Sequence, residues 1–324
     1  MKKCLILFAG IVMLLSGCKS LSLSLPPLES QHVLITHVKE PLLTVVDVDR
    51  KEIVHEEPFK FNVQSFEKIK DRYVAVTGKI ESKVLLIDLQ TGKVRSLISS
   101  VTSITDMFYD HWRDFLYLTD AKHNEVLVFD VEKEEIIKRI QVGNYPNALA
   151  VDKSFLYVLN GDSNHVTVID LSKLETVLTF PVVEHPTDIV VNERYVWVGG
   201  HGSYGELNEF VYVYEKMNGN FVKKVKAGLM PIAFHIDEGG QELFVLSHGS
   251  NELHIIDIDT FRVTKRLLTD DNPYYVTADE RYIYVTTLDG DTLHVFDRKT
   301  YTSKEKFSLR SGPYGIVLGG SSNE

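Results

Sequence analysis

Cysteine is almost absent from this chain. Only Cys4 and Cys18 occur among 324 residues, and both lie within the first 18 positions. Because no thiol follows, residues 19–324 cannot form a disulfide, a zinc–thiolate site or a cysteine nucleophile. Three common kinds of stabilising or catalytic site are therefore excluded for nearly the whole chain.

Helical periodicity and short catalytic motifs are also missing. Beyond the N-terminus, no segment repeats its apolar residues every 3.6 positions, which excludes a solenoid of helices. Neither Gly-x-Ser-x-Gly nor His-Glu-x-x-His occurs. The glycine-rich segment 199–210 is not followed by a helix or a lysine, so it is not expected to be a phosphate-binding loop.

Positive charge is scarce relative to negative charge. The chain has 35 Lys and Arg against 45 Asp and Glu, a formal charge of −10 that becomes −12 without the N-terminal Lys2 and Lys3. Nucleic-acid affinity depends on Lys and Arg that neutralise phosphates, and anionic lipids attract basic segments. We therefore expect no nucleic-acid partner and no electrostatic attachment to a membrane.

What the chain does contain is a repeat of about 42 residues. Seven strand-like apolar runs each end in an acidic residue, and successive acidic residues are 40 to 45 positions apart. A repeat of this length indicates supersecondary units that must stack to bury their apolar faces. The runs occupy residues 43–47, 84–88, 126–130, 166–170, 211–215, 253–257 and 293–297.

The copy at residues 155–192 shows the internal order of one unit. Turn-forming residues separate four runs rich in β-branched and aromatic residues, at 155–160, 166–170, 176–180 and 188–191. Four short antiparallel strands in about 42 residues are typical of a propeller blade. The sequence therefore predicts an all-β fold, a seven-bladed β-propeller with four-stranded antiparallel blades.

The ends of the repeat array predict how the ring closes. The Pro-led strand that follows each unit is expected to become the innermost strand of the next blade. The first unit, from Val33, has no such strand before it, whereas the last such strand, 313–318, has no unit after it. Pairing of 313–318 with 33–38 would close the ring and leave no bare sheet edge.

Several repeats resemble the YVTN family of β-propeller repeats. The resemblance is carried by Tyr-Val-Leu-Asn at 157–160, Tyr-Val-Thr-Thr at 284–287, Val-x-Val-Ile-Asp at 166–170 and Val-Gly-Asn-Tyr-Pro at 142–146. It spans residues 32–319 and implies the propeller fold. It does not imply one function, because propellers host unrelated activities.

The N-terminus is typical of an export signal with a lipid-attachment site. A basic start is followed by a short apolar stretch, and Leu-Ser-Gly-Cys at 15–18 resembles a bacterial lipobox. The resemblance implies cleavage before Cys18, whose thiol would carry diacylglycerol. An uncleaved signal anchor and ordinary secretion are the alternatives.

These features divide the chain into four parts. We expect a lipoprotein signal peptide at 1–17, the lipidated cysteine and a tether at 18–31, the propeller at 32–319 and a tail at 320–324. Fully extended, the tether would reach about 40 Å at ~3.3 Å per residue. The protein is expected outside the cytoplasm, anchored by lipid to the bacterial cell membrane or outer membrane.

Residues at the start of the innermost strands are the main candidates for ligand contacts, because the loops there line the mouth of the central channel. Tyr145 and His185 each precede a Pro at this position, and Tyr274 and Tyr314 each follow one. The three tyrosines could capture a small ligand such as an amine or a sugar. His185 is the histidine expected nearest the mouth.

Three acidic residues, Glu67, Asp106 and Asp188, occupy equivalent places near the ring axis. One interpretation is a site for an amine or a divalent cation, the single cofactor that the sequence suggests. The other is structural, with each carboxylate capping free backbone N–H groups of a neighbouring blade, because unpaired buried donors are costly.

Four histidines, His123, His165, His201 and His248, fall in loops between the second and third strands of consecutive blades. Because successive blades fan apart, these side chains are not expected to meet at the ~2 Å ligand distance that one metal ion needs. The long loop at 199–210 is either a binding segment or an extended hairpin tip.

Two classes of function remain. The first is a non-catalytic scaffold of the cell envelope that binds a protein or a small molecule. The second is an extracytoplasmic propeller enzyme, similar to sugar-lactone hydrolases or quinoprotein dehydrogenase subunits, with a cation among Glu67, Asp106, Asp188 and His185. The missing nucleophile–base motif favours the first.

Overall fold

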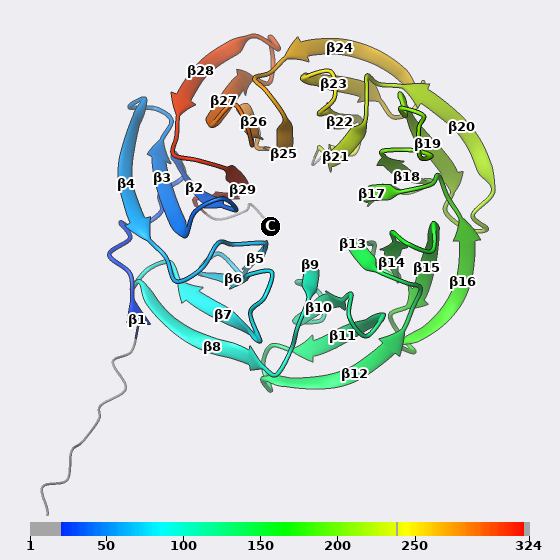
Figure 1. Ribbon diagram of the computed structural model, residues 1–324, viewed down its shortest axis with the longest axis horizontal. Coiled ribbons are helices and arrows are strands. Elements are labelled where there is room, and N and C mark those ends of the chain that lie inside the picture. Colours follow the sequence, from blue (N-terminus) through cyan, green and yellow to red (C-terminus); the bar gives the residue numbers. More distant parts are fainter. Residues whose placement is uncertain (1–20, 238, 321–324) are drawn as a thin grey trace, which may run out of the picture.

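Seven antiparallel sheets form a closed ring of blades in the computed structural model, which describes residues 21–237 and 239–320 (Figure 1). Each blade has four strands, and one blade has an added fifth strand at its outer edge. No helix occurs within the described residues, and so none there could cross a membrane. The predicted all-β, seven-bladed propeller is confirmed.

The blades are numbered along the chain, and their strands are given from the ring axis outward. Blade 1 contains β29 (Pro313–Leu318), β2 (His32–His37), β3 (Leu42–Asp47) and β4 (Glu52–Pro58). Blade 2 contains β5 (Ser65–Ile69), β6 (Tyr73–Thr77), β7 (Lys83–Asp88) and β8 (Lys93–Ser99), with β1 (Leu21–Ser22) outside β8. Blade 3 contains β9 (Ile104–Asp110), β10 (Phe115–Asp120), β11 (Glu125–Asp130) and β12 (Glu135–Gln141). Blade 4 contains β13 (Pro146–Val151), β14 (Phe155–Asn160), β15 (His165–Asp170) and β16 (Glu175–Pro181).

The remaining three blades follow the same order. Blade 5 contains β17 (Pro186–Val191), β18 (Tyr195–Gly200), β19 (Phe210–Glu215) and β20 (Phe221–Lys226). Blade 6 contains β21 (Pro231–Ile236), β22 (Glu242–Ser247), β23 (Glu252–Asp257) and β24 (Arg262–Leu268). Blade 7 contains β25 (Pro273–Ala278), β26 (Tyr282–Thr287), β27 (Thr292–Asp297) and β28 (Ser303–Ser308).

The ring closes as the sequence predicts. The last strand, β29, pairs with β2 and becomes the innermost strand of blade 1, with Leu34 opposite Val317 and Ile35 opposite Ile316. Blade 1 therefore combines the two ends of the propeller. Pairing with β29 keeps β2 from being a bare edge, and β29 takes the innermost place that the Pro-led strands have in other blades.

The acidic residues that define the repeat end the third strand of each blade and shape the turn that follows. Asp170 Oδ1 accepts hydrogen bonds from the backbone N–H of Ser172 at 2.8 Å, and Asp257 Oδ1 accepts one from that of Thr260 at 2.7 Å. These are Asx turns, in which a short carboxylate replaces a backbone acceptor. The 42-residue period therefore reflects blade architecture.

The hydrophobic core lies between neighbouring blades. Tyr117 and Val126 of blade 3, for example, pack with Leu156 and Val158 of blade 4 in one cluster of fully buried side chains. The middle strands are buried on both faces, whereas an outer strand such as β24 is mostly exposed. Each blade buries its faces only against its neighbours, so the stability of one blade depends on the complete ring.

The described part of the expected tether, residues 21–31, lies against the rim of the ring. Leu21 and Ser22 pair with β8, Leu23 N–H donates to the carbonyl of Gly92 at 2.8 Å, and Leu23 is 6% exposed. At Gly92, where φ is +69°, an added Cβ would lie 2.0 Å from the Leu23 oxygen, so this approach requires glycine. The alternation of Leu and Ser from 21 to 25 is the strand pattern that accounts for the pairing. Cys18 and the signal peptide lie outside the described residues.

Candidate functional site

The face of the ring on which β13, β17, β21, β25 and β29 begin is called the mouth face. The residue before the first Pro of each of these strands has a left-handed backbone conformation, with φ between 48° and 69°. Its N–H often donates to an Asn or Asp side chain of the preceding hairpin, as Tyr145 does to Asn124 at 3.0 Å and His185 does to Asn164 at 2.9 Å. This repeated bond positions the side chains of Tyr145, His185 and Asn272 on the mouth face, whereas Met230 N–H donates to the backbone carbonyl of Asn208 at 2.7 Å.

A cavity of about 280 Å³ lies at the centre of the mouth face. Its lining brings together five of the residues that the sequence predicts as site residues, whereas Glu67 and His185 are outside the lining. The five are Asp106, Asp188, Tyr145, Tyr274 and Tyr314.

Each predicted carboxylate bonds to the backbone of the next blade. Glu67 Oε1 accepts from Tyr109 N at 2.9 Å, Asp106 Oδ2 from Leu149 N at 2.8 Å and Asp188 Oδ2 from Phe234 N at 2.7 Å. The second oxygens of Asp106 and Asp188 accept from the N–H groups of Met107 and Ile189. The structural interpretation of these residues is therefore correct, and any ligand contact must come in addition to it.

The residue before each carboxylate position also contacts the next blade, but as a hydrogen-bond donor. Thr105 Oγ1 donates to the carbonyl of Pro146 at 2.6 Å, and Asn147 Nδ2 donates to that of Pro186 at 3.0 Å. Carboxylates that accept and neighbouring side chains that donate thus join the innermost strands of blades 3, 4 and 5. The channel wall is preorganised by these bonds.

The carboxylates titrate far from their ordinary range. Burial in the channel wall raises the pKa of Glu67 and Asp188 to about 8 and the pKa of Asp106 to about 7. The charge of Asp106 adds to the rise at Glu67 and Asp188. At neutral pH the mouth therefore holds protons on some of these groups, and its negative charge is smaller than the sequence implies.

Aromatic rings form the other side of the channel, on β5, β25 and β29. The ring centroids of Phe66 and Tyr275 are 5.3 Å apart, and those of Tyr274 and Tyr314 are 5.5 Å apart. Gly315 allows this packing, because an added Cβ would lie 1.9 Å from the Phe66 ring. The cavity thus has an aromatic half and a half that carries Asp106 and Asp188, so it suits a ligand with an apolar body and a polar or cationic end.

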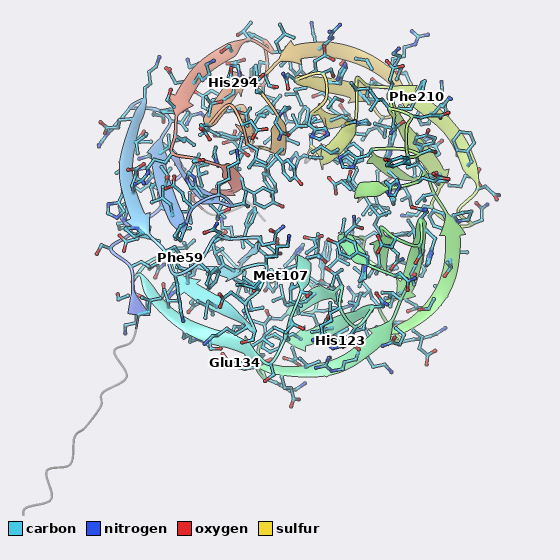
Figure 2. The ribbon with its side chains drawn as sticks, in the orientation of Figure 1. Phe59, Met107, His123, Glu134, Phe210 and His294 are labelled. Carbon is cyan, nitrogen blue, oxygen red and sulfur yellow. The ribbon has the colours of Figure 1, made fainter. Side chains whose placement is uncertain are left out.

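The loop histidines differ in where they lie. His123 bonds to Asp120 of its own hairpin at 2.8 Å, far from the ring axis (Figure 2). In contrast, the ring centroids of His201 and His248 are 5.2 Å apart, and His201 lines the cavity. His201 is therefore a site residue that the sequence analysis missed.

The ligand atoms of Asp120, His123 and Glu125 all lie within 4.8 Å of one another on blade 3. Each carboxylate already has protein partners, since Asp120 accepts from two backbone N–H groups and Glu125 accepts from Arg139 and Gln141. We interpret this cluster as a structural element of the hairpin.

The long loop of blade 5 is closed at its base. Asn208 is buried, and its Nδ2 donates to the carbonyls of Gly200 and Phe210 at 2.9 and 2.8 Å. Tyr204 at the tip is 99% exposed. These contacts agree with the extended hairpin tip, one of the two interpretations from the sequence.

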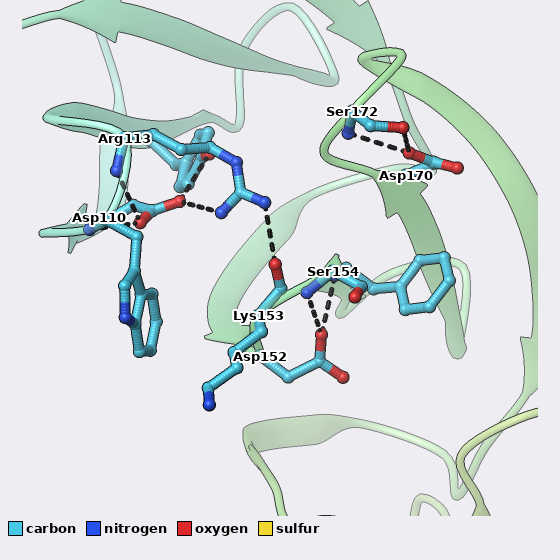
Figure 3. Close-up of polar contacts among 10 residues, drawn as sticks. Asp110, Arg113, Asp152, Lys153, Ser154, Asp170 and Ser172 are labelled. Carbon is cyan, nitrogen blue, oxygen red and sulfur yellow. Dashed lines mark hydrogen bonds and ion pairs between the residues drawn. The ribbon is translucent and has the colours of Figure 1, made fainter.

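Carboxylates also shape turns on the face opposite the mouth. Asp152 Oδ1 accepts from Ser154 N and Phe155 N at 2.7 Å, and Arg113 joins Asp110 of blade 3 to the Lys153 carbonyl of blade 4 (Figure 3). Asp110 and Asp152 therefore use their carboxylate oxygens as hydrogen-bond acceptors within or beside the turns that they shape.

Fold and cavity together define the chain as a seven-bladed β-propeller with a preorganised channel mouth. No protein-family model matches its sequence, and no curated protein matches it either.

Three solved structures are similar to it in fold. A functionally unknown protein from Desulfotomaculum acetoxidans DSM 771 superposes with a TM-score of 0.75 at 12% identity, over 90% of this chain and 100% of that one. Dihydro-heme d1 dehydrogenase NirN, in complex with DHE, has a TM-score of 0.67 at 14% identity, over 91% and 76%. AztD of Citrobacter koseri has a TM-score of 0.62 at 11% identity, over 90% and 99%. At these identities the similarity shows the fold alone.

Proposed function

We propose that this chain is a lipid-anchored binding protein of the bacterial cell envelope, with a small ligand in the cavity of the mouth face. The observation that carries the proposal is the two-sided lining of that cavity. Tyr145, Tyr274 and Tyr314 offer ring faces, and Asp106 and Asp188 offer carboxylates with one backbone bond on each oxygen. An amine-bearing ligand matches both halves, through cation–π contacts with the rings and through charge-assisted hydrogen bonds to the ionised forms of Asp106 and Asp188.

The cavity lining favours binding over hydrolysis. The alternative is an enzyme of the lactonase or quinoprotein type, with a cation among Glu67, Asp106, Asp188 and His185. Only Asp106 and Asp188 of these four residues line the cavity. The enzyme is therefore the weaker proposal.

Removal of one exposed ring at the mouth should weaken the binding of an amine about fivefold or more, since a cation–π contact contributes roughly 1 kcal/mol or more when partly desolvated. Tyr274 is 37% exposed, and the aromatic contact between blades that Tyr274→Ala removes is the one with Tyr314. We expect a thermal-shift screen of primary amines and monosaccharides to yield a ligand whose dissociation constant rises in this variant.

Two further variants make that screen decisive. Tyr204→Ala, which changes the 99% exposed tyrosine of the blade 5 loop, should leave the affinity unchanged. Asp188→Asn should weaken an amine and leave a neutral sugar unaffected, so it distinguishes the two ligand classes. A wild-type protein that binds neither class, or a Tyr274→Ala variant with full affinity, would contradict the proposed site.

Lipid attachment would bring the propeller close to the membrane. Leu21 is paired to β8, so two residues separate it from Cys18 in the sequence. Three residue steps span about 10 Å at ~3.3 Å each, well short of the ~40 Å expected for a free tether. In this arrangement the membrane lies beside the rim of blade 2.

Cys18→Ala should abolish the anchor without changing the fold. We expect the wild-type protein, expressed in a bacterium, to incorporate labelled fatty acid and to sediment with membranes, and the Cys18→Ala variant to do neither. Cys4→Ala, which leaves the lipobox intact, is the matched control and should behave as wild type. Labelled, membrane-bound Cys18→Ala protein would refute the anchor.

A further inference from the structure

A thioether sulfur, of Met230, and an imidazole nitrogen, of His248, lie in contact on the mouth face of blade 6. Met230 directly precedes β21, and His248 directly follows β22. His248 Nε2 lies 3.2 Å from Met230 Sδ. The backbone places them together, since His248 N–H donates to the Met230 carbonyl at 3.2 Å.

The hydrogen bond of the other ring nitrogen, Nδ1, determines the tautomer of His248. Nδ1 lies 3.1 Å from Asn272 Oδ1. The orientation of that amide follows from its Nδ2, which donates to Asp289 Oδ2 at 2.9 Å. Lys39 and Asn272 lower the pKa of Asp289, so its carboxylate only accepts hydrogen bonds. Asn272 therefore presents its oxygen to His248, and Nδ1–H is the donor.

In the neutral imidazole this arrangement leaves a lone pair on Nε2, directed at the thioether of Met230. Two lone-pair donors then face each other at 3.2 Å. Ligand bonds of about 2.0 Å to nitrogen and 2.3 Å to sulfur place the two atoms ~3.2–3.5 Å apart when the angle at the metal is about 95–110°. The spacing is therefore that of two ligands of one ion, and the Asn272 contact is the outer-shell bond that metal-binding histidines usually make.

His201 of blade 5 lies beside this pair. Its ring centroid lies 5.2 Å from that of His248, with the planes at 67° to each other.

We propose that His201, Met230 and His248 bind a monovalent copper ion at the rim of the channel mouth. A thioether with imidazoles and without a carboxylate selects Cu(I) over zinc, calcium or magnesium. The site borders the ligand cavity through His201 and does not depend on what that cavity binds.

The test is competition for Cu(I) against a chromophoric chelator such as bicinchoninate. The full chain is used with Cys4→Ser and Cys18→Ser, so that no thiol competes for the metal. We expect one equivalent of Cu(I) to be retained and X-ray absorption to show one sulfur neighbour at about 2.3 Å. Met230→Leu, which preserves shape and volume, should lower the affinity at least tenfold and abolish the sulfur signal.

Histidine variants locate the remaining ligands. His248→Gln and His201→Gln should each lower the affinity at least tenfold, and Asn272→Ala, a positioning variant, about tenfold. His165→Gln, at the corresponding loop of blade 4, should bind copper as the parent does.

Three results would overturn the assignment. They are transfer of all copper to the chelator, retention of zinc in preference to copper, and a copper centre without a sulfur neighbour. The last is read from the parent protein alone, so it remains decisive even if a variant fails to fold.

Discussion

A chain that ends at Gly312 is expected to lose its cooperative fold. The truncation removes β29, which supplies the innermost strand of blade 1. Ile316 and Val317, each about 4% exposed or less, pack in the cores that join blade 1 to blades 7 and 2. Burial of one such side chain contributes about 1.5–3 kcal/mol.

Polar groups left behind add to this loss. Without β29, the inner edge of β2 loses its backbone partners, and each unsatisfied buried group costs roughly 1–3 kcal/mol. Lys68 Nζ also loses the Leu318 carbonyl, and Thr286 loses that of Tyr314. Together these terms reach the ~5–15 kcal/mol that typically separates a folded domain from its unfolded state.

Circular dichroism and size-exclusion chromatography would show the result as a lost melting transition and aggregation through the bare edge of β2. A chain that ends at Gly320, which keeps β29, is the matched control and should melt within a few degrees of the full chain. Val317→Ala should retain the fold with a lower melting temperature. Wild-type melting of the chain that ends at Gly312 would show that β29 does not close the ring.

The fold can be predicted from the sequence because each blade repeats the same local chemistry. Acidic residues such as Asp170 shape a turn at intervals of 40 to 45 residues, and Pro residues such as Pro146 begin five of the seven innermost strands. The unpaired strands at the two ends of the array leave one economical closure. In contrast, the pairing of Leu21 and Ser22 with β8 was missed, because a two-residue strand with serines resembles a linker.

Less of the site can be predicted, because its contacts join residues of different blades. The two interpretations of Asp106 could not be separated from the sequence, since its partner, Leu149 N–H, is 43 residues away. The contact between His201 and His248 depends on the spacing of blades 5 and 6 at the mouth, which the repeat pattern does not specify. These contacts depend on how neighbouring blades pack, whereas the strand pattern that predicts the fold repeats within each blade.

The buried carboxylates should make the protein less stable as the pH rises from about 7 to 8.5. Burial raises the pKa of Glu67 and Asp188 to about 8 and of Asp106 to about 7, whereas in the unfolded chain these groups titrate near pH 4. Between these values the folded state binds protons that the unfolded state has released. The stabilisation is complete below about pH 4 and is lost as the pH rises through the folded pKa values.

Buried histidines act in the opposite direction at lower pH. Burial lowers the pKa of five histidines, so their contribution to stability is lost as the pH falls through about 6.5; they are His37, His201, His235, His254 and His294. Above about pH 7 these histidines are neutral in both states. The interval from pH 7 to 8.5 therefore isolates the carboxylates.

Urea unfolding at pH 7.0, 7.75 and 8.5 measures the effect. Each group lowers the free energy of unfolding by at most about 1.4 kcal/mol per pH unit, so the midpoint should fall steadily. Asp188→Asn should reduce the slope, because the neutral amide has no proton to release. Asp170→Asn is the matched control, since the bonds from Ser172 lower the pKa of Asp170 and remove it from this interval. An unchanged midpoint in the wild-type protein would mean that the carboxylates of the channel wall are already ionised at pH 7, and the channel mouth would then carry its full negative charge.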